Sequence, residues 1–558
     1  MESYFLNDEK IDSVKNNSEL LQSSHENKID CEEPSKYDIQ ENIYSKSFYL
    51  ILNDDYNAIN KINQLYPKKY NTFYRICCHG YTNKEIPFFE YKHIALLLKG
   101  TIYNYEELYD RFEIFNDDIF LDDEDIDNKH EKLFISLYKK YGIEYTLQLL
   151  DGEFCVILID DNFNAPETKM FVAMDRLGIQ PFYVLKSAQM DEYNNIFCFS
   201  NSKLILDNTL KNLKSNESRY KSSYYSITSF QPGSYSEYIL PYKVLSTWQL
   251  KKENVKYSNY DTVETIYNYE KHSLITKTNL DNIMSTLRER LNQSVKNLLK
   301  YNSSNIFGGI IESTNDKPRI ACLITGNLHS SLIIGLIYNY INTFLLKNVE
   351  IDTYCVGLEN SDEIYYSRII SKYFNTNHTE IIISEKEMNN KKSIVIEILE
   401  KTGEIIDEKT INNGVITYIL CEYIKTKTNH NEIITDFGAE ELLGSNLDLC
   451  NILQYDFECK NLIKNYYNNN AIFKKIYNYF NLQLLSPFFD QKLIHYYLSL
   501  PLEFRYSKWL YNYFSENDLY KPKNIVFMND FLLRVTFSKA YHVLSIKEVL
   551  PEDILWEI

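Results

Sequence analysis

The first half of the chain alternates short apolar runs with polar segments. Residues 1–46 are polar and acidic, which predicts a disordered tail because too little surface can be buried to offset the ordering entropy. From residue 47 the runs are rich in β-forming residues. A helical stretch is predicted to begin at Asn104, and a second helix is predicted at Lys132–Tyr141. This pattern predicts an α+β domain of layered sheets. The predicted strands are Phe48–Leu52, Phe73–Cys78, His93–Leu98, Phe154–Ile159, Met170–Met174, Phe182–Leu185 and Ile196–Phe199.

Two polar segments bound this half of the chain. We interpret residues 206–226 as a polar insertion and residues 251–279 as a linker, so the first domain is expected to span 47–250. The second domain then spans 280–558.

The second half alternates helical and strand patterns, which indicates βαβ units and a parallel sheet. Ligands bind at the carboxyl ends of such strands, so the loops after Ile324, Val356 and Thr435 are expected to converge. The predicted elements are a helix at Leu280–Leu299, a strand at Ile320–Ile324, a helix at Leu332–Phe344, a strand at Ile351–Val356, a helix at Asp362–Tyr373, a strand at Glu380–Ile383, a helix at Thr410–Lys425 and a strand at Ile433–Thr435.

The segment Arg319–Tyr340 carries the clearest binding pattern, with an apolar strand, a polar loop at Thr325–Ser331 and an apolar helix. The loop amides and the helix N-terminus would point at one spot and favour a phosphate or pyrophosphate. Ser330 and Ser331 could cap the helix.

Length, charge and cysteine usage narrow the class of protein. A chain of 558 residues is long enough for two cores, and a net charge of -18 argues against a nucleic-acid binder or a protein that adheres to anionic membranes. Ten cysteines without a C-x-x-C pair argue against zinc sites and disulfides. The N-terminus lacks a signal-peptide pattern, and no apolar run is long enough to span a membrane, so a cytoplasmic location is expected.

Ten short motif blocks follow one another along both halves of the chain. They are Lys99–Leu108, Leu150–Phe154, Asp175–Tyr183, Pro232–Tyr235, Thr325–Ser331, Val356–Leu358, Gly438–Gly444, Ser486–Asp490, Leu532–Arg534 and Leu550–Trp556. These blocks resemble, in the same order, those of the glutamine-hydrolysing asparagine synthetases. This resemblance implies an N-terminal-nucleophile glutaminase joined to an adenine-nucleotide-binding synthetase domain. The implied substrates and cofactors are glutamine, aspartate, ATP and Mg, with ammonia passing from the first site to the second.

The family's glutaminase nucleophile is an N-terminal cysteine whose own α-amine is the base. Residue 2 is Glu2, and the strand that would follow the nucleophile matches Phe48–Leu52. The nucleophile position therefore falls near 45–47, inside the chain. Cleavage before Cys31 would expose a cysteine, but Glu-Glu-Pro follows it instead of the family's strand start.

The residues around this predicted glutaminase site also differ from the family pattern. Lys99 replaces an oxyanion-binding asparagine, Thr101 replaces a substrate-binding glutamate, and His130 stands at an acidic position. Arg75 matches the arginine that holds the glutamine carboxylate, although a surface ion pair would explain an arginine equally well.

By resemblance, the ATP and pyrophosphate site of the second domain keeps hydroxyls and turn glycines but changes its charges. His329 replaces a metal-side carboxylate, and a histidine in a loop is most often solvated. Phe437 replaces a carboxylate of the acyl-adenylate step, and Asp436 adds repulsion toward a triphosphate. The metal ligands are unknown. The ATP and pyrophosphate residues that the resemblance assigns are Thr325, Gly326, Ser330, Ser331, Val356, Gly438, Glu440, Glu441 and Asp490.

Three further positions depart from the family. Leu485 and Asn412 stand where arginines are expected, and Glu557 and Ile558 follow Trp556 where the family continues to a phosphate-binding lysine. Loss of a phosphate contact and a catalytic carboxylate together would cost several orders of magnitude in rate.

Two functional hypotheses follow. The first is an active ATP-dependent asparagine synthetase. The second, which we favour, is a catalytically impaired descendant that acts as a binding or scaffold protein, with a residual ammonia-dependent ligase as the intermediate case. A homodimer and pairing with an active paralogue are both left open.

Overall fold

The structure, a computed structural model, describes residues 48–52, 71–73, 77–81, 88–121, 128–162, 164–187, 197–216, 225–241, 248–258, 277–306, 318–343, 349–359, 361–402, 408–443, 452–464, 466–480 and 482–505. All described residues belong to the unit Asn42–Ile558, which contains both predicted domains.

Two antiparallel sheets form the first domain. Sheet A has the strand order β10-β8-β9-β1-β3-β2, and sheet B has the order β12-β11-β7-β6-β5-β4. The strands are β1 (Phe48–Leu52), β2 (Asn71–Phe73), β3 (Cys77–Tyr81), β4 (Phe89–Tyr91), β5 (Ile94–Ile102), β6 (Gly152–Asp160), β7 (Glu167–Met174), β8 (Tyr183–Ser187), β9 (Phe197–Ser200), β10 (Tyr225–Ser229), β11 (Ser234–Pro241) and β12 (Gln249–Lys256). The helices are α4 (Tyr105–Arg111), η2 (Ile114–Asn116), α5 (Asp118–Leu121), α6 (Lys129–Leu149) and α7 (Lys203–Asn216).

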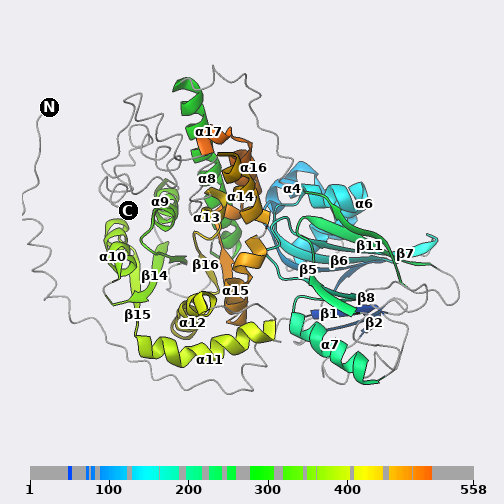
Figure 1. Ribbon diagram of the computed structural model, residues 1–558. Helices are drawn as coiled ribbons and strands as arrows, with labels where there is room; N and C mark the ends of the chain where they lie inside the picture. Colours follow the sequence, from blue (N-terminus) through cyan, green and yellow to red (C-terminus); the bar gives the residue numbers. More distant parts are fainter. Residues whose placement is uncertain are drawn as a thin grey trace, which may run out of the picture. The chain divides into compact units, whose positions relative to one another are not determined.

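The layers explain the continuous apolar runs in the sequence. Strand β6 is covered on both sides, because Cys155, Ile157 and Ile159 face the core between the sheets while alternate residues such as Phe154 face α6. Helix α6, sheet B, sheet A and α7 stack in that order (Figure 1). The predicted antiparallel α+β architecture is confirmed.

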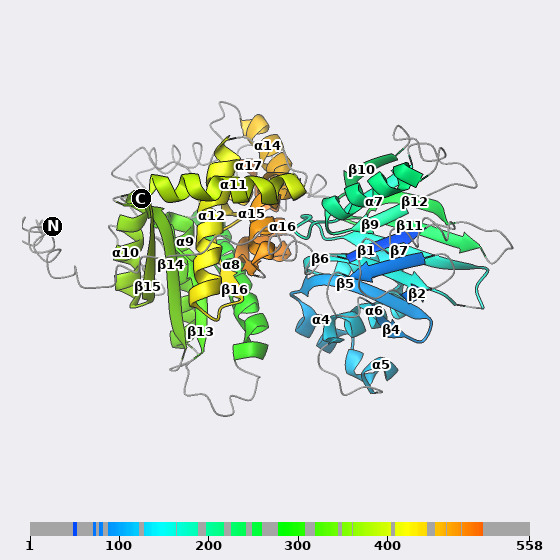
Figure 2. The same cartoon turned by 90° about the horizontal axis from the view of Figure 1, so that it is seen from below.

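Sheet C of the second domain is parallel, with the order β15-β14-β13-β16-β17, and helices cover both faces (Figure 2). The predicted parallel α/β architecture is confirmed. Its elements are α8 (Lys277–Ile306), β13 (Arg319–Leu323), α9 (Leu328–Thr343), β14 (Glu350–Leu358), α10 (Asp362–Phe374), β15 (Asn377–Ile383), α11 (Glu385–Thr402), α12 (Glu408–Lys427), β16 (Glu432–Ile434), α13 (Ala439–Leu443), α14 (Ile452–Lys464), α15 (Tyr466–Tyr479), β17 (Gln483–Leu485), η6 (Pro487–Phe489), α16 (Gln491–Ser499) and α17 (Leu502–Arg505).

Several predicted boundaries need correction. The range 206–226 is not simply a polar insertion, because it contains most of α7 and the start of β10; Ile205 and Leu206 pack in the core between the sheets. The predicted strand Phe73–Cys78 corresponds to the separate strands β2 and β3. Strand β12 and helix α8 both extend into the predicted linker 251–279. The domain limits themselves stay a prediction.

The turn after β7 joins the two domains. The buried carboxylate of Asp175 accepts hydrogen bonds from the backbone N–H groups of Phe154, Leu177, Ile179 and Gln180. The turn that it holds inserts Leu177 and Ile179 into the main core of the second domain. The block Asp175–Tyr183 therefore has a structural role in this fold.

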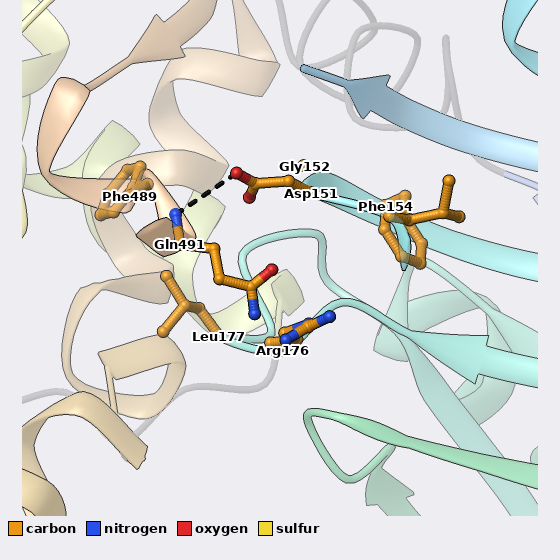
Figure 3. A pocket seen from close by; sticks show the side chains of 8 residues that line it. Asp151, Gly152, Phe154, Arg176, Leu177, Phe489 and Gln491 are labelled. Carbon is orange, nitrogen blue, oxygen red and sulfur yellow. Dashed lines mark hydrogen bonds between the residues drawn. The ribbon is translucent and has the colours of Figure 1, made fainter. Parts of the chain in front are cut away.

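Two acidic side chains meet close to this turn. The backbone N–H of Gln491, from α16, donates to Asp151 Oδ2 at 3.4 Å, beside a small pocket that Arg176 and Phe489 also line (Figure 3). Burial and the neighbouring Asp490 raise the pKa of Asp151 to about 8. Burial also raises the pKa of Asp490. This contact between the domains therefore favours a protonated carboxyl group.

None of the described helices combines the length and apolar character that crossing a bilayer requires.

The raised pKa of Asp151 predicts a pH-dependent stability. Between pH 3.8, the ordinary pKa of an aspartate, and about pH 8, the Asp151 carboxyl group is protonated in the folded chain but ionised in the unfolded chain. The stability that this group contributes is therefore lost as the pH rises through that range. The Asp151→Asn variant should show a shallower fall in the free energy of unfolding from pH 5 to pH 8, measured by urea denaturation.

The matched control is Asp118→Asn, since the Asp118 side chain is 69% exposed. This variant should keep the slope of the natural protein. An equal slope in the Asp151→Asn variant would contradict the assignment.

Candidate functional site

The predicted pyrophosphate loop connects β13 to α9 and is shorter than expected. Helix α9 begins at Leu328, so His329, Ser330 and Ser331 belong to its first turn. Gly326 has a φ of +76°, and a Cβ added there would lie 2.6 Å from the Tyr366 Cβ of α10. The glycine is therefore required both by the turn and by close packing.

Asn327 caps the helix, in place of the serines that we predicted. Its Oδ1 accepts a hydrogen bond from Ser330 N at 2.8 Å, as an N-cap side chain does. The Ser331 hydroxyl donates to the Asn327 carbonyl, and Thr325 N donates to Ser330 Oγ at 3.2 Å. Ser330 and Ser331 are each only 1% exposed. Their hydroxyls thus serve the loop's own structure.

The second loop follows β16 and turns sharply against η6. Thr435 N donates to Leu485 O at 2.8 Å, and the Ser486 hydroxyl donates to the Phe437 carbonyl. Gly438 has a φ of +88°, and an added Cβ would lie 2.6 Å from the Phe489 ring. This glycine is also fixed by packing.

The two loops meet through one hydrogen bond. Asn327 Nδ2 donates to Asp436 Oδ2 at 2.9 Å, so the Asn327 side chain caps α9 with one atom and holds the second loop with the other. The expected convergence of the loops after Ile324 and Thr435 is confirmed. This hydrogen bond uses the Asn327 amide of one loop and the Asp436 carboxylate of the other, at the place where a phosphate was predicted to bind.

Aromatic packing surrounds these loops. His329 is 4% exposed, and its ring lies edge-on to Phe488 at 6.1 Å between centroids, so the expectation of a solvated histidine was wrong. Phe437 packs against Phe473 of α15 at 5.3 Å. Both residues that replace family carboxylates therefore contribute to packing.

The remaining predicted ligands lie in different settings. Val356 is near the carboxyl end of β14 and is half-buried, while Glu440 and Glu441 are in the first turn of α13. Asp490 Oδ1 accepts a hydrogen bond from Leu493 N at 2.9 Å and so caps α16. Their assignment as ATP or pyrophosphate ligands stays a prediction.

The donor set at the two loops does not fit a magnesium pyrophosphate. The Asp436 carboxylate of the second loop accepts a hydrogen bond from Asn327, and His329 packs on Phe488. A metal-bound pyrophosphate favours free carboxylate oxygens and anion-facing donors. In the described part of the chain, no group of three His, Cys, Asp or Glu side chains is placed to hold a metal ion.

In the first domain, the predicted glutamine pocket lies on the inner face of sheet B. Thr101 is paired across the strands with Glu153, and Lys99 is paired with Cys155, so all four share that face. Burial raises the pKa of the Cys155 thiol to about 12, which keeps it protonated and argues against a replacement nucleophile. Arg75, Cys31, the nucleophile position at 45–47 and all of 506–558 lie outside the described residues.

His130 is placed in the first turn of α6, with its ring edge-on to Tyr105 at 5.4 Å. Burial, and then the neighbouring Lys129, lower the pKa of His130 to about 4. The side chain is therefore neutral near pH 7 and does not supply the negative charge expected at this position.

Sequence reasoning missed the contribution of the second domain to this pocket. Lys474 of α15 contacts Glu153, and Gln483 Nε2 donates to Thr101 Oγ1 at 3.4 Å. The sequence did indicate that Glu153 needs a partner. Strand alternation places Glu153 on the same face as the apolar residues Cys155 and Ile157, and a charge buried there requires a compensating group. The source of that partner was not readable from the sequence.

Comparison with known proteins agrees with this two-domain arrangement. The glutamine amidotransferase domain family matches residues 70–261, and the asparagine synthase family matches residues 312–453. Asparagine synthetase (glutamine-hydrolyzing) of Mesocricetus auratus is 25% identical over 511 residues, which cover 87% of this chain and 76% of that protein. The Gallus gallus protein of the same name is 26% identical over 507 residues, covering 86% and 75%, and the Homo sapiens protein is 24% identical over 511 residues, covering 87% and 76%. With both domains matched in order and the corresponding sheets present, the chain combines a glutamine amidotransferase domain with an asparagine synthase domain and is similar to the glutamine-hydrolysing asparagine synthetases over most of its length.

Proposed function

We propose that this chain is an asparagine synthetase-like protein in which the ancestral reaction, ATP-dependent amidation of aspartate with glutamine-derived ammonia, is impaired. The observation that carries the proposal is the hydrogen bond between Asn327 and Asp436. It ties together the two loops that would need to open toward ATP and its pyrophosphate. A negative charge at Asp436 further disfavours a triphosphate by repulsion.

Changes at the individual positions support the same conclusion. His329 and Phe437 stand where the family has carboxylates, and both are packed against aromatic rings. Neither side chain can orient a metal-bound phosphate or ammonia in that position. The rate lost with two such groups together is several orders of magnitude.

The first domain supports a parallel loss of glutamine hydrolysis. Lys99 and Thr101 replace the oxyanion-binding and substrate-binding residues, and the buried Cys155 thiol is protonated. Without glutamine hydrolysis, any remaining ligase activity would depend on free ammonia.

A non-catalytic binding role is the second candidate, and one surface supports it. Tyr141 and Tyr145 are 44% and 46% exposed, and the Tyr141 ring contacts those of Tyr145 and Phe112. Exposed clustered aromatic side chains favour protein partners. Pairing with an active paralogue, a homodimer and a cytoplasmic location belong to this proposal as predictions.

A pyrophosphate-release assay on the full chain tests the proposed impairment. With aspartate, ATP and Mg, neither glutamine nor ammonia should give aspartate-dependent pyrophosphate above background, because the loops and charges of the site have changed. An active glutamine-hydrolysing relative serves as the positive control. Clear aspartate-dependent turnover with ammonia would contradict the impairment of the second domain.

Removing the negative charge of Asp436 should improve nucleotide binding. The Asp436→Asn variant keeps the size of the side chain but removes the repulsion, so affinity for Mg-ATP should rise by about five- to tenfold, a change of about 1 kcal/mol. Isothermal titration calorimetry measures this affinity.

The control for this experiment is Asp362→Asn, which removes an exposed charge from the first turn of α10. It should leave Mg-ATP affinity within twofold of the natural protein. An equal rise in Mg-ATP affinity in both variants would come from the lower overall negative charge of the protein and would contradict a specific effect of Asp436 at the loops.

A further inference from the structure

A buried carboxylate stands in the core of the first domain. Glu153 is fully buried in β6, on the face where its neighbours Cys155 and Ile157 form the core between the sheets. Its Oε2 contacts Lys474 Nζ, and its Oε1 is buried without a hydrogen-bond partner among the described residues. A buried carboxylate needs a cation or several donors, so this position is built to receive positive charge.

The cation comes from the other domain. Lys474 lies in α15 and its side chain is 10% exposed, which places the ammonium group in the first domain's interior. Burial and the like charge of Lys99 lower the pKa of Lys474 to about 7. The contact with Glu153 is the compensating interaction for this costly burial.

The same spot is where the family resemblance places glutamine. Thr101 is directly opposite Glu153 across strands β5 and β6, and Lys99 is two residues away on the same face. Gln483 of β17 also reaches Thr101, through its side-chain amide. Two side chains of the second domain therefore enter the predicted glutamine pocket.

We propose that this pocket is a binding site for a primary ammonium group and that Lys474 is its tethered ligand. Glu153 supplies the charge, and its second oxygen can accept another N–H of the same group, since an ammonium carries three donors. The pocket is thereby occupied by the chain's own side chain, which joins the two domains and leaves no place for glutamine. This holds whether or not the second domain retains ligase activity.

The expected selectivity follows from charge and hydrogen bonding. A primary alkylammonium offers both a positive charge and N–H donors. Tetramethylammonium has the charge without the donors, and an alcohol has a donor without the charge. Only the primary amine should therefore replace the Lys474 side chain.

Chemical rescue of a truncated lysine tests the site in the full chain. Lys474→Ala leaves Glu153 buried without its cation, so the unfolding temperature should fall by about 6 °C or more. Propylammonium corresponds to the atoms removed and should raise the unfolding temperature of this variant in a concentration-dependent way, measured by calorimetry. Tetramethylammonium and propanol should not.

The control variant combines Lys474→Ala with Glu153→Gln, which removes the charge that binds the amine. Propylammonium should not stabilise this double variant or the natural protein, in which Lys474 fills the site. Millimolar glutamine should also leave the unfolding temperature of the natural protein unchanged. Equal stabilisation of the single and double variants by propylammonium, or a rise with glutamine, would overturn the proposal.

A second pair of variants covers the case in which Lys474→Ala does not fold. Lys474→Met keeps most of the side-chain volume but leaves the carboxylate unpaired, while Lys474→Met with Glu153→Gln removes both charges. The double variant should unfold at the higher temperature, because the unpaired buried charge is gone. The opposite order would contradict a cation site at Glu153.

Discussion

A buried ion pair between Glu153 and Lys474 links the two domains. Leaving one member of a buried ion pair without the other costs about 3 to 5 kcal/mol, which is a large fraction of the stability of a domain. Apolar side chains reinforce the same interface, because the turn held by Asp175 places Leu177 and Ile179 in the core of the second domain. Domain docking is thus part of folding in this chain.

The same principle applies at the two loops of the second domain. Hydroxyl groups that the family resemblance assigns to a ligand make hydrogen bonds within the chain, as in the bond from the Ser331 hydroxyl to the Asn327 carbonyl. Gly326 and Gly438 are kept for reasons of backbone and packing, since a Cβ at either position would meet a neighbouring side chain at 2.6 Å. A retained glycine in this family is therefore weak support for retained catalysis.

The sequence was sufficient for the fold because apolar periodicity reports burial directly. Strand β1 and the strands β13, β14, β15 and β16 of sheet C were predicted from such runs. Strand β17 was not predicted, and α7 was missed because its apolar positions are embedded in Lys, Asn and Ser. Contacts between distant side chains were less predictable. The burial of His329 depends on Phe488, and the second hydrogen bond of Asn327 depends on Asp436; both partners are far away in the chain.

We propose that this protein keeps the scaffold of these synthetases but has lost the chemistry of aspartate activation. Aspartate-dependent exchange of labelled pyrophosphate into ATP measures that step alone and is independent of the nitrogen source. The account predicts no exchange above the rate without aspartate. Exchange that requires aspartate and saturates with its concentration would contradict it.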